Sequence, residues 1–539
     1  MVTITETNKA KISVSRNKKW HGLRLGVQIF VFALFLYLLL GTTQQLPTFL
    51  PPDFFFHFDP LAGISSMLAS RSWIGPMALG IITLALTLVI GRVWCSWVCP
   101  MGSLLDWIPS YRVKKNTPDI PRYWRQVKYF LLFLILVGAL FGSLTLMLLD
   151  PITILYRAIT TTVLPSLSIA IVGGEELLYN VVFLKPVVEW FDSLVRGWLL
   201  TGQTFFLANV WILVLFLAVL GLNAVRSRFW CRYLCPLGGL LALVSVISIK
   251  RHTVASDTCI SCYRCSTICH TGAINPANKF SASASECTSC MECVDKCPTK
   301  AISFSGQRGA AIPQSFDPSR REFLASLGIA AIGAAFLRFT PIFHNSKSSV
   351  IRPPGSNEER LLSQCIRCGE CVKVCPTGLL QPSSSLKGID NLWTPEAVMR
   401  TGYCDYSCNA CGQVCPSEAI PKLPLLAKQK TVIGKAVIDT NRCIPWSEAR
   451  ECIVCEEMCP IPTKAIRLSG GGGGQGSKSS TRRPKVQEDL CIGCGICEAQ
   501  CPVKGQAAIR VFPDGQGQDI ISKYQTLNTE YSTNSRNPK

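Results

Sequence analysis

Histidine is scarce in this chain of 539 residues. There are five histidines, and none lies in the four longest apolar stretches, so a haem with two histidine ligands cannot be placed between those stretches. Acidic residues are also few, since 34 of them against 54 lysines and arginines give a formal net charge of +20. No nucleic-acid-binding motif accompanies this charge. We therefore attribute it to membrane topology and to contact with anionic lipids.

No cysteine is left outside a motif, although the chain has 28. Most of them form groups of four, typically with the C-x2-C-x2-C-x3-C-P spacing of bacterial ferredoxins, in which three thiolates hold one cubane and the fourth reaches a second cluster. Structural zinc usually takes two separated C-x2-C pairs, and a disulfide framework does not explain the repeated Cys-Pro ending. The pattern predicts about six 4Fe-4S clusters. Their expected ligands are Cys259, Cys262, Cys265 and Cys269; Cys287, Cys290, Cys293 and Cys297; Cys365, Cys368, Cys371 and Cys375; Cys404, Cys408, Cys411 and Cys415; Cys443, Cys452, Cys455 and Cys459; and Cys491, Cys494, Cys497 and Cys501.

The remaining cysteines stand in two copies of a C-x3-C-P motif, Cys95/Cys99 and Cys231/Cys235. Residues 92–105 align with residues 228–241 around these motifs. Units repeated in the same orientation imply a pseudo-twofold axis along the membrane normal, which could bring both pairs together. The four thiols then either hold one further iron–sulfur cluster, or serve as packing residues or as a docking surface, and the spacing leaves these alternatives open.

Apolar runs indicate a membrane protein. Runs of spanning length occur at 24–42, 74–91, 129–149 and 205–222, with a shorter one near 323–339. Basic residues precede the first run and follow the second and fourth, so the amino terminus and both C-x3-C-P motifs are expected on the cytoplasmic side. Connections 43–73 and 150–204 are expected outside. We predict a multidomain protein: an α-helical membrane bundle of four spans in tandem two-helix repeats, a fifth export-signal anchor, and α+β ferredoxin-like iron–sulfur domains.

A pair of arginines precedes the last apolar run. Arg320 and Arg321 stand in a segment similar to a twin-arginine export signal, placed inside the chain. An ordinary fifth span with basic flanks is the alternative. Export of a folded domain suits a protein whose clusters are inserted in the cytoplasm, and no clear cleavage site follows, so the segment is expected to remain as an anchor.

These signals divide the chain into seven parts. The expected parts are a cytoplasmic basic tail (1–23), the four-span domain (24–251), a two-cluster ferredoxin (252–312), the internal signal and anchor (313–344), a linker (345–358), a four-cluster ferredoxin-like domain (359–513) and a polar tail (514–539). One residue departs from the ferredoxin pattern, because His270 replaces the proline after Cys269. It either tunes a cluster through hydrogen bonding or is a solvated structural residue.

Two family resemblances follow from these motifs. Residues 24–305, with four apolar runs, two C-x3-C-P motifs and two ferredoxin groups, resemble the NapH/MauN family of membrane quinol-dehydrogenase-type proteins. Residues 319–513 look like the NapG/MauM family of exported four-cluster proteins. The resemblance implies electron transfer from the membrane quinone pool to an extracytoplasmic redox enzyme or cytochrome, in a multi-pass protein of the cell (inner) membrane. It also implies that, of the last four cysteine groups, the first shares clusters with the fourth and the second with the third.

The mechanism meets one physical obstacle. A hydrocarbon core of about 30 Å separates the two groups of clusters, so a mobile quinone or a partner subunit is expected to connect them. No catalytic residue is assigned. Asp59 and Asp150, each before a proline at the outer end of a repeat, could accept quinol protons, or they are ordinary helix-end residues. The rival function is maturation or regulation, in which the protein assists assembly of a metalloenzyme.

Overall fold

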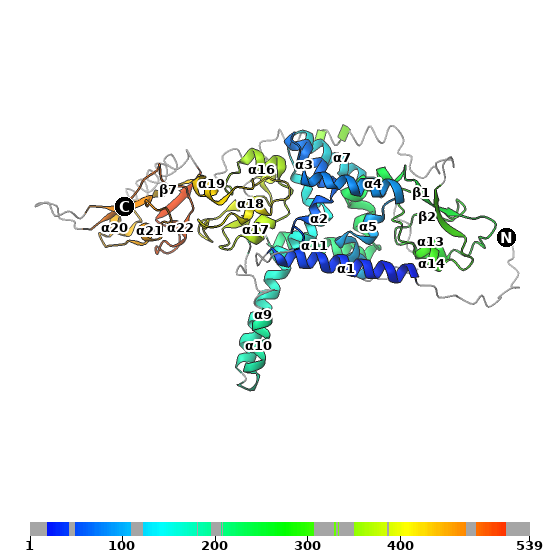
Figure 1. Cartoon of the computed structure of the whole chain (residues 1–539), viewed down its shortest axis with the longest axis horizontal. Coiled ribbons are helices and arrows are strands. Elements are labelled where there is room, and N and C mark those ends of the chain that lie inside the picture. The colour runs from blue at the N-terminus through cyan, green and yellow to red at the C-terminus, as the bar shows by residue number, and fades with distance from the viewer. Residues whose placement is uncertain are drawn as a thin grey trace, which may run out of the picture.

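The chain folds into several domains that follow one another along its longest axis (Figure 1). A helical bundle separates one small α+β domain from two others, and most of the described chain is helical. This computed structural model describes residues 19–42, 49–108, 122–180, 182–195, 206, 209–306, 328–329, 332–333, 350–384, 388–470 and 481–513.

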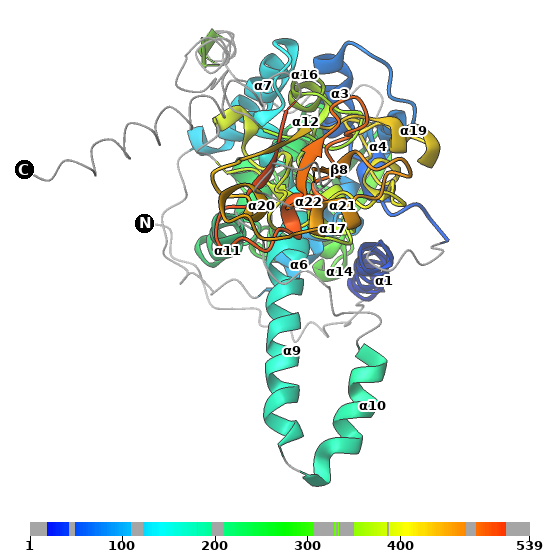
Figure 2. The ribbon, with the colours of Figure 1, turned by 90° about the vertical axis from the view of Figure 1, so that its left-hand side faces the viewer.

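The bundle is built from short helices packed around a common apolar core. Its elements are α1 (Lys19–Gly41), α2 (Phe54–His57), α3 (Pro60–Ser70), η1 (Pro76–Leu79), α4 (Gly80–Ile90), α5 (Val93–Trp97), α6 (Pro100–Trp107), η2 (Arg122–Gln126), α7 (Val127–Leu140), η3 (Thr145–Leu149), α8 (Pro151–Ala158), η4 (Ile159–Val163), α9 (Leu164–Tyr179), η5 (Val182–Leu184), α10 (Lys185–Val195), α11 (Asn209–Val225), η6 (Trp230–Leu234) and α12 (Pro236–Ser245). The core includes fully buried Leu61, Leu132 and Leu241. Helices α9 and α10 leave this core as a hairpin (Figure 2).

Two helices in the described residues are long and apolar enough to cross a membrane. They are α1, with 23 residues, and the continuous helix Pro151–Tyr179, with 29. The first coincides with the predicted span 24–42. The second is a correction, because the sequence pattern placed it in the external connection 150–204. Asp150 caps this helix and Pro151 stands in its first turn, and both features favour a helix start.

The other predicted spans are helical but shorter than a full crossing. The runs 74–91, 129–149 and 205–222 contain α4 with η1, α7 and α11. Gly91 and Gly142 adopt positive φ angles of 84° and 75° and end two of these helices, so an apolar run did not guarantee one continuous helix. Within the residues that the structure describes, the expectation of four spans plus an anchor is thus reduced to two candidate spans. Arg320, Arg321 and most of 323–339 lie outside the described residues.

The first α+β domain follows α12. Its strands are β1 (Lys250–Val254), β2 (Ile274–Asn275), β3 (Ser281–Ala282) and β4 (Ile302–Gly306), and its helices are α13 (Arg264–Ile268) and α14 (Glu292–Lys296). Strand β1 pairs with β4 in antiparallel register, from Lys250 opposite Gly306 to Val254 opposite Ile302, and β2 pairs with β3. The pairing of β1 with β4 brings the two ends of the domain together.

Two further α+β units lie beyond the opposite end of the bundle. The first contains α16 (Glu358–Gln364), α17 (Glu370–Val374), β5 (Leu380–Pro382), η8 (Ile389–Asn391), β6 (Pro395–Ala397), α18 (Ala410–Gln413) and α19 (Leu425–Lys430). The second contains β7 (Lys435–Ile438), α20 (Ile444–Ser447), α21 (Val454–Glu457), β8 (Ile466–Ser469), β9 (Arg483–Val486), α22 (Ile496–Ala499) and β10 (Ile509–Phe512). Residues 350–352, expected in the linker, are packed on the first unit: Arg352 is buried and its guanidinium donates to Asn391 and to the carbonyl of Pro395.

Candidate iron–sulfur sites

The regular cysteine groups share one local backbone conformation. In four of them, residues on either side of the second cysteine have positive φ, which turns the loop tightly. A short helix follows, and the last cysteine then adopts an extended backbone, as Cys269, Cys297 and Cys375 do. The residues with positive φ are Ser261 and Tyr263, Ser289 and Met291, Arg367 and Gly369, and Gly493 and Gly495.

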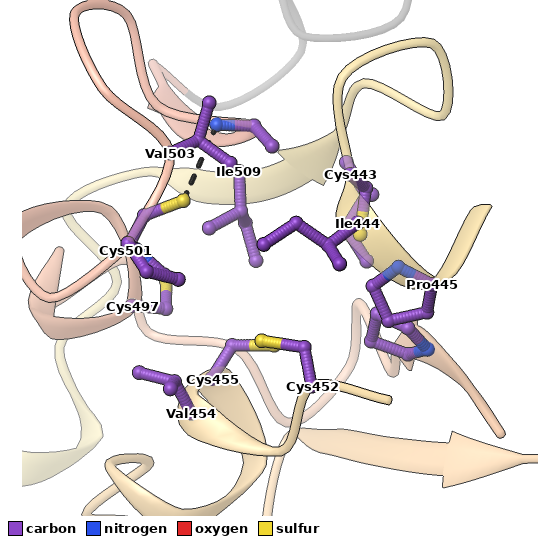
Figure 3. Close-up of a pocket in the computed structure, with 14 residues that line it drawn as sticks. Cys443, Ile444, Pro445, Cys452, Val454, Cys455, Cys497, Cys501, Val503 and Ile509 are labelled. Carbon is purple, nitrogen blue, oxygen red and sulfur yellow. Dashed lines mark hydrogen bonds between the residues drawn. The ribbon is translucent and has the colours of Figure 1, made fainter. Parts of the chain in front are cut away.

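Each of three hollows is lined by three cysteines of one group and the fourth cysteine of another. One hollow has Cys259, Cys262, Cys265 and Cys297. A second has Cys365, Cys368, Cys371 and Cys415. The third has Cys443, Cys452, Cys455 and Cys501, and Cys497 lines it as well (Figure 3). This exchange of the fourth cysteine is the arrangement of two-cluster ferredoxins.

The remaining cysteines of these groups form three sets in which the fourth cysteine is again exchanged between two groups. Within electrostatic reach of one another are Cys287, Cys290, Cys293 and Cys269; Cys404, Cys408, Cys411 and Cys375; and Cys491, Cys494 and Cys459, with Cys497. Consecutive groups therefore share sites. The pairing implied by the family resemblance, first group with fourth and second with third, is wrong for this chain, because each group folds together with the group next to it in sequence.

Many of these thiols are buried or half-buried, Cys262 is exposed, and some are hydrogen-bonded. Loss of hydration on burial raises the pKa of Cys287 and Cys455 to about 12 and that of Cys415 to about 11, so metal binding at these sites must displace protons. Backbone amides donate to several sulfurs, such as Ala508 N to Cys501 Sγ at 3.4 Å (Figure 3). Such bonds tune cluster potentials. Among the described residues, no three metal-binding side chains converge on a point fit for a single ion.

His270 does not stand free in solvent. Its Nε2 lies 2.6 Å from Glu292 Oε2, and Arg24 of α1 contacts the other carboxylate oxygen at 2.5 Å. Burial alone would raise the pKa of Glu292, but the hydrogen bond and charge of His270, followed by the charge of Arg24, lower it to about 2. The histidine thus takes part in a contact between the first α+β domain and the bundle, which its position in the sequence did not reveal.

The two C-x3-C-P motifs meet inside the bundle. Cys95 lies on α5 and Cys231 on η6, a single turn of π-helix, while Cys99 and Cys235 cap α6 and α12 ahead of a proline. All four are at most 7% exposed. Cys99 is within electrostatic reach of Cys231, and Cys235 of Cys95. The repeat therefore places four thiols together, which is the donor set that a 4Fe-4S cluster requires.

Asp59 and Asp150 also meet, although 91 residues separate them in sequence. Each caps a helix: Asp59 accepts from the amide of Leu61 and Asp150 from that of Thr153, both at 2.9 Å. The prediction that these are helix-end residues is therefore correct for one oxygen of each carboxyl group. The two carboxyl groups also lie within electrostatic reach of each other, and both residues are fully buried. The second oxygen of each group, Asp59 Oδ2 and Asp150 Oδ1, has no hydrogen-bond partner among the described residues. Two adjacent buried negative charges would be costly, so at least one of the two groups must hold a proton.

The bundle contacts the first α+β domain through buried charges. Lys128 Nζ lies 2.7 Å from Glu286 Oε1. Ser96 Oγ donates to the carbonyl of Thr288 at 2.9 Å, and Trp97 Nε1 to that of Ser289 at 3.1 Å. The loop between Cys95 and Cys99 is therefore hydrogen-bonded to the loop between Cys287 and Cys290.

The opposite end of the bundle contacts the loop that carries Cys365 and Cys368. Arg157 Nη1 donates to the carbonyl of Arg367 at 3.0 Å, and the Arg157 guanidinium lies 4.1 Å from the ring centre of Trp393. Lys373 Nζ donates to Thr42 Oγ1, just after α1, at 2.6 Å. Sequence patterns gave no sign of these contacts, because they join residues more than 200 positions apart.

Models of iron–sulfur domains match several stretches of the chain. A 4Fe-4S binding domain matches residues 73–118 and 208–253, which contain the two C-x3-C-P motifs. A 4Fe-4S dicluster domain matches residues 364–419 and 450–505, in agreement with the cysteine exchange seen there. Another dicluster model matches residues 279–376, but the structure places its two cysteine groups at opposite ends of the bundle, so they form no common unit. No solved structure matches the chain.

Curated relatives are ferredoxin-type proteins. The ferredoxin-type protein NapG of Escherichia coli is 34% identical over 212 residues, which cover 38% of this chain and 88% of the relative. The methylamine utilization ferredoxin-type protein MauM of Methylorubrum extorquens is 34% identical over 209 residues, 36% of this chain and 90% of the relative. NapG of Haemophilus influenzae is 28% identical over 224 residues, 40% of this chain and 79% of the relative. The resemblance of residues 24–305 to the NapH/MauN family stays a prediction. Through about 40% of its length, the chain belongs to the NapG/MauM family of ferredoxin-type iron–sulfur proteins.

Proposed function

We propose that this protein takes electrons from membrane quinol and passes them, through a cluster held in the bundle, to an extracytoplasmic redox enzyme or cytochrome. One observation carries the proposal. Ser96 and Trp97, which stand between Cys95 and Cys99, donate to the loop of Cys287 and Cys290 in the second site of the first α+β domain. A cluster at the four thiols would thus adjoin a ferredoxin site, as electron transfer requires.

The sites formed by the cysteines of residues 359–513, called the outer sites below, also lie one after another. The amide of Cys404 donates to the carbonyl of Cys494 at 2.7 Å, which joins the two outer units at their cysteine loops. On the bundle side, Arg367 of the first outer site donates to the carbonyl of Leu144. The sites therefore follow one another outward from the bundle. The 4Fe-4S clusters that we propose here supply one-electron transfer over a wide range of potentials.

The direction of α1 supports a membrane position for the bundle. This helix runs along the long axis of the molecule (Figure 1), with the first α+β domain beside its start and the outer units beyond its end. Its 23 residues extend for about 34 Å at 1.5 Å per residue, enough to cross a core of about 30 Å. Charged domains lie at both ends of this axis, so the membrane normal must follow it. By the positive-inside rule, the first α+β domain is then cytoplasmic and the outer units are exported.

The paired carboxyl groups suit a proton-accepting role. Oxidation of a quinol to a quinone releases two electrons and two protons. Asp150 lies within electrostatic reach of Cys99 on one side and of Arg157, which contacts the first outer site, on the other. Asp59 and Asp150 are thus placed between the four thiols and the outer sites. The pair already holds one proton and has room for one more, so we propose that it takes the two quinol protons one after the other and releases the first before it accepts the second.

Quinol-driven reduction tests this function. The full chain, purified without oxygen and placed in lipid nanodiscs, should show electron paramagnetic resonance signals of reduced clusters after addition of a short-chain quinol. Asp59→Asn should slow this reduction while dithionite still reduces the clusters. If quinol reduces none of the clusters but the protein transfers iron–sulfur units to an apo-ferredoxin, the maturation function replaces this proposal.

A further inference from the structure

Two arginines occupy equivalent places in the repeat of the bundle. Arg92 and Arg228 each stand three residues before the first cysteine of their copy. They are 1% and 2% exposed. A guanidinium keeps its charge under all ordinary conditions, and a buried charge is costly unless another charge and hydrogen bonds compensate it. Their burial therefore needs an explanation.

Each arginine reaches into the other copy of the repeat. Arg228 Nη1 donates to the carbonyl of Cys95 at 3.1 Å. Arg92 Nη2 lies close to Gly238, since a Cβ added to this glycine would be 3.0 Å from Nη2. The amide of Gly238 in turn donates to Cys235 Sγ at 3.2 Å. The two guanidiniums thus cross over the pseudo-twofold axis, each beside a cysteine of the other copy.

Carboxylates do not balance the positive charge around the four thiols. Arg228 forms a two-pronged ion pair with Asp106, which also faces Arg24 at 3.9 Å. Arg92 is 3.9 Å from Glu286, whose nearer partner is Lys128 at 2.7 Å. Among the described residues, this end of the bundle sets five buried cations against three carboxylates. The cations are Arg24, Arg92, Lys128, Arg228 and Arg232, and the carboxylates are Asp106, Glu286 and Glu292.

We propose that Arg92 and Arg228, one from each repeat, are the counter-charges of an iron–sulfur cluster held by Cys95, Cys99, Cys231 and Cys235, and that they raise its reduction potential. A cubane with four thiolates carries about two negative charges when oxidised and gains one more when it takes an electron. A fixed positive charge stabilises the reduced form more than the oxidised one, since the attraction grows with the charge. A higher potential favours acceptance of electrons from a quinol. This inference rests on the cluster that the proposed function places at the four thiols.

The arginines also connect this site to the next one. Arg92 Nη1 donates to the carbonyl of Ser285 at 2.7 Å, two residues before Cys287. Arg228 is within electrostatic reach of both Cys231 and Cys290. The same pair of charges therefore lies between the two sites and acts on both, and the effect on the bundle site should be the larger one because both guanidiniums contact its loops.

A redox titration with charge-removing and charge-keeping variants tests the pair. The full chain in nanodiscs is compared with Arg92→Gln, Arg228→Gln, Arg92→Lys and Arg228→Lys. Arg251→Gln is the control, because it removes a guanidinium that donates to the carbonyls of Ser248 and Val246 and is not among the five buried cations named above. Cys95→Ser with Cys231→Ser identifies the signal of the bundle cluster by subtraction. We expect the potential of that signal to shift to lower values in both Gln variants, and to stay near its original value in the Lys variants and in the control.

The outcomes separate the inference from the function on which it rests. Equal potentials in the Gln variants and the unmodified chain would overturn the counter-charge role. Loss of the cluster in both the Gln and the Lys variants would also overturn it, in favour of hydrogen bonding by the guanidinium fork. Loss of the cluster in the Gln variants but not in the Lys variants would support the counter-charge role. If the cysteine double variant holds as much iron as the unmodified chain, the bundle has no cluster and the proposed function fails first.

A second inference concerns the hairpin of α9 and α10. No residue of α9 after Ser168 is buried. The two helices are joined at the tip, where the Tyr179 hydroxyl donates to Glu189 at 3.2 Å and Lys185 Nζ lies 4.9 Å from the Tyr179 ring centre. The hairpin is strongly apolar on its outside, with Leu177 74% and Phe183 86% exposed. Such a surface marks contact with lipid or protein.

The hairpin runs crosswise to α1 in both views (Figures 1 and 2). The long helix Pro151–Tyr179 and α1 therefore cannot both follow the membrane normal, and the charged domains assign that direction to α1. The hairpin leaves the bundle next to Arg157, which contacts the outer unit, so it lies at the level of the outer membrane–water boundary. In α10, Val187, Trp190 and Phe191 share one face at helical spacing, opposite Glu189 and Asp192, as in helices that lie in such a boundary.

We infer that the hairpin of α9 and α10 is an arm that rests in the lipid headgroup region on the outer side, with its apolar face on the acyl chains. Its acidic residues, Glu175, Glu176, Glu189 and Asp192, outnumber Lys185, so burial of apolar side chains and not attraction to anionic lipid must hold it. Tryptophan at position 190 suits this depth, since its ring has both an apolar body and a polar N–H group.

Photocrosslinking tests the arm. Benzoylphenylalanine is placed at Phe183, at Trp190 or, as a control on the polar face of α10, at Ser193, in the full chain within phosphatidylcholine nanodiscs. We expect lipid adducts by mass spectrometry at the first two positions and several-fold fewer at the third. Adducts to a second copy of the chain, or equal lipid yields at all three positions, would overturn the inference.

Discussion

The two ends of the bundle hold their iron–sulfur domains by different means. The end next to the first α+β domain is called the inner end, and the end next to residues 350–513 is called the outer end. At the inner end, cations of the bundle form ion pairs with carboxylates of that domain, as Arg24 does with Glu292 and Lys128 with Glu286. At the outer end, Arg157 donates to a backbone carbonyl and Lys373 donates to a hydroxyl. Buried ion pairs are strongly destabilised when one partner is lost, whereas a bond to a carbonyl costs less. The inner contact is therefore the more sensitive to single substitutions.

The largest effect should come from the thiols at the inner end. Cys95→Ser with Cys231→Ser should remove about four iron atoms per chain and abolish quinol-dependent reduction of the clusters, while the protein still enters the membrane. Iron analysis and electron paramagnetic resonance measure both results. Ser96→Ala, which removes only the hydroxyl between the two cysteines, is the matched control and should keep its iron. Unchanged iron with lost reduction would instead support a docking surface.

The next effect compares the cysteine pairing at the outer end with the pairing that family resemblance implies. Cys415→Ser should disturb the site of Cys365, Cys368 and Cys371, because Cys415 lines that hollow. Cys501→Ser should leave that site intact and disturb the one that contains Cys443. Spectra of the two variants should therefore lose different cluster signals. A change in the Cys365-dependent signal on Cys501→Ser would contradict this arrangement and would mean that the first group shares a site with the fourth.

Lys128→Met sharpens the comparison of the two ends. It leaves Glu286 buried without its nearest cation, at a cost of about 3–5 kcal/mol. Arg157→Met at the outer end removes hydrogen bonds to carbonyls, at a cost of about 1–3 kcal/mol. Lys128→Met should increase hydrogen exchange in residues 250–306. Arg157→Met should increase exchange in residues 350–384 by a smaller amount. Lys128→Met with Glu286→Gln should restore much of the protection, and equal exchange in both single variants would remove the distinction between the two ends.

The sequence predicted local chemistry well and long-range contacts poorly. Cysteine spacing indicated each ferredoxin loop, because three thiols close together in the chain can converge only on one point. The repeat of Cys95/Cys99 and Cys231/Cys235 indicated that the two pairs meet, since a tandem repeat carries its own symmetry. Composition overestimated the spans, because a single glycine such as Gly142 can end a helix inside an apolar run. The pairing of groups and the contact of Asp59 with Asp150 depend on packing between distant segments, which no spacing encodes.

The smallest effect compares the two copies of the repeat within the bundle. Gly102 and Gly238 hold the same place after each Cys-Pro. A Cβ on Gly102 would lie 2.3 Å from the carbonyl oxygen of Cys95, which belongs to the backbone. A Cβ on Gly238 would lie 3.0 Å from the end of the Arg92 side chain and 3.2 Å from the carbonyl oxygen of Cys231. Gly102→Ala must therefore shift the cysteine loop, at a cost of about 1–3 kcal/mol, while Gly238→Ala needs only small adjustments. Thermal inactivation of quinol-dependent reduction should occur at a lower temperature in Gly102→Ala than in Gly238→Ala. The reverse order would show that the second copy, with its turn of π-helix, is the more rigid half of the four-thiol site.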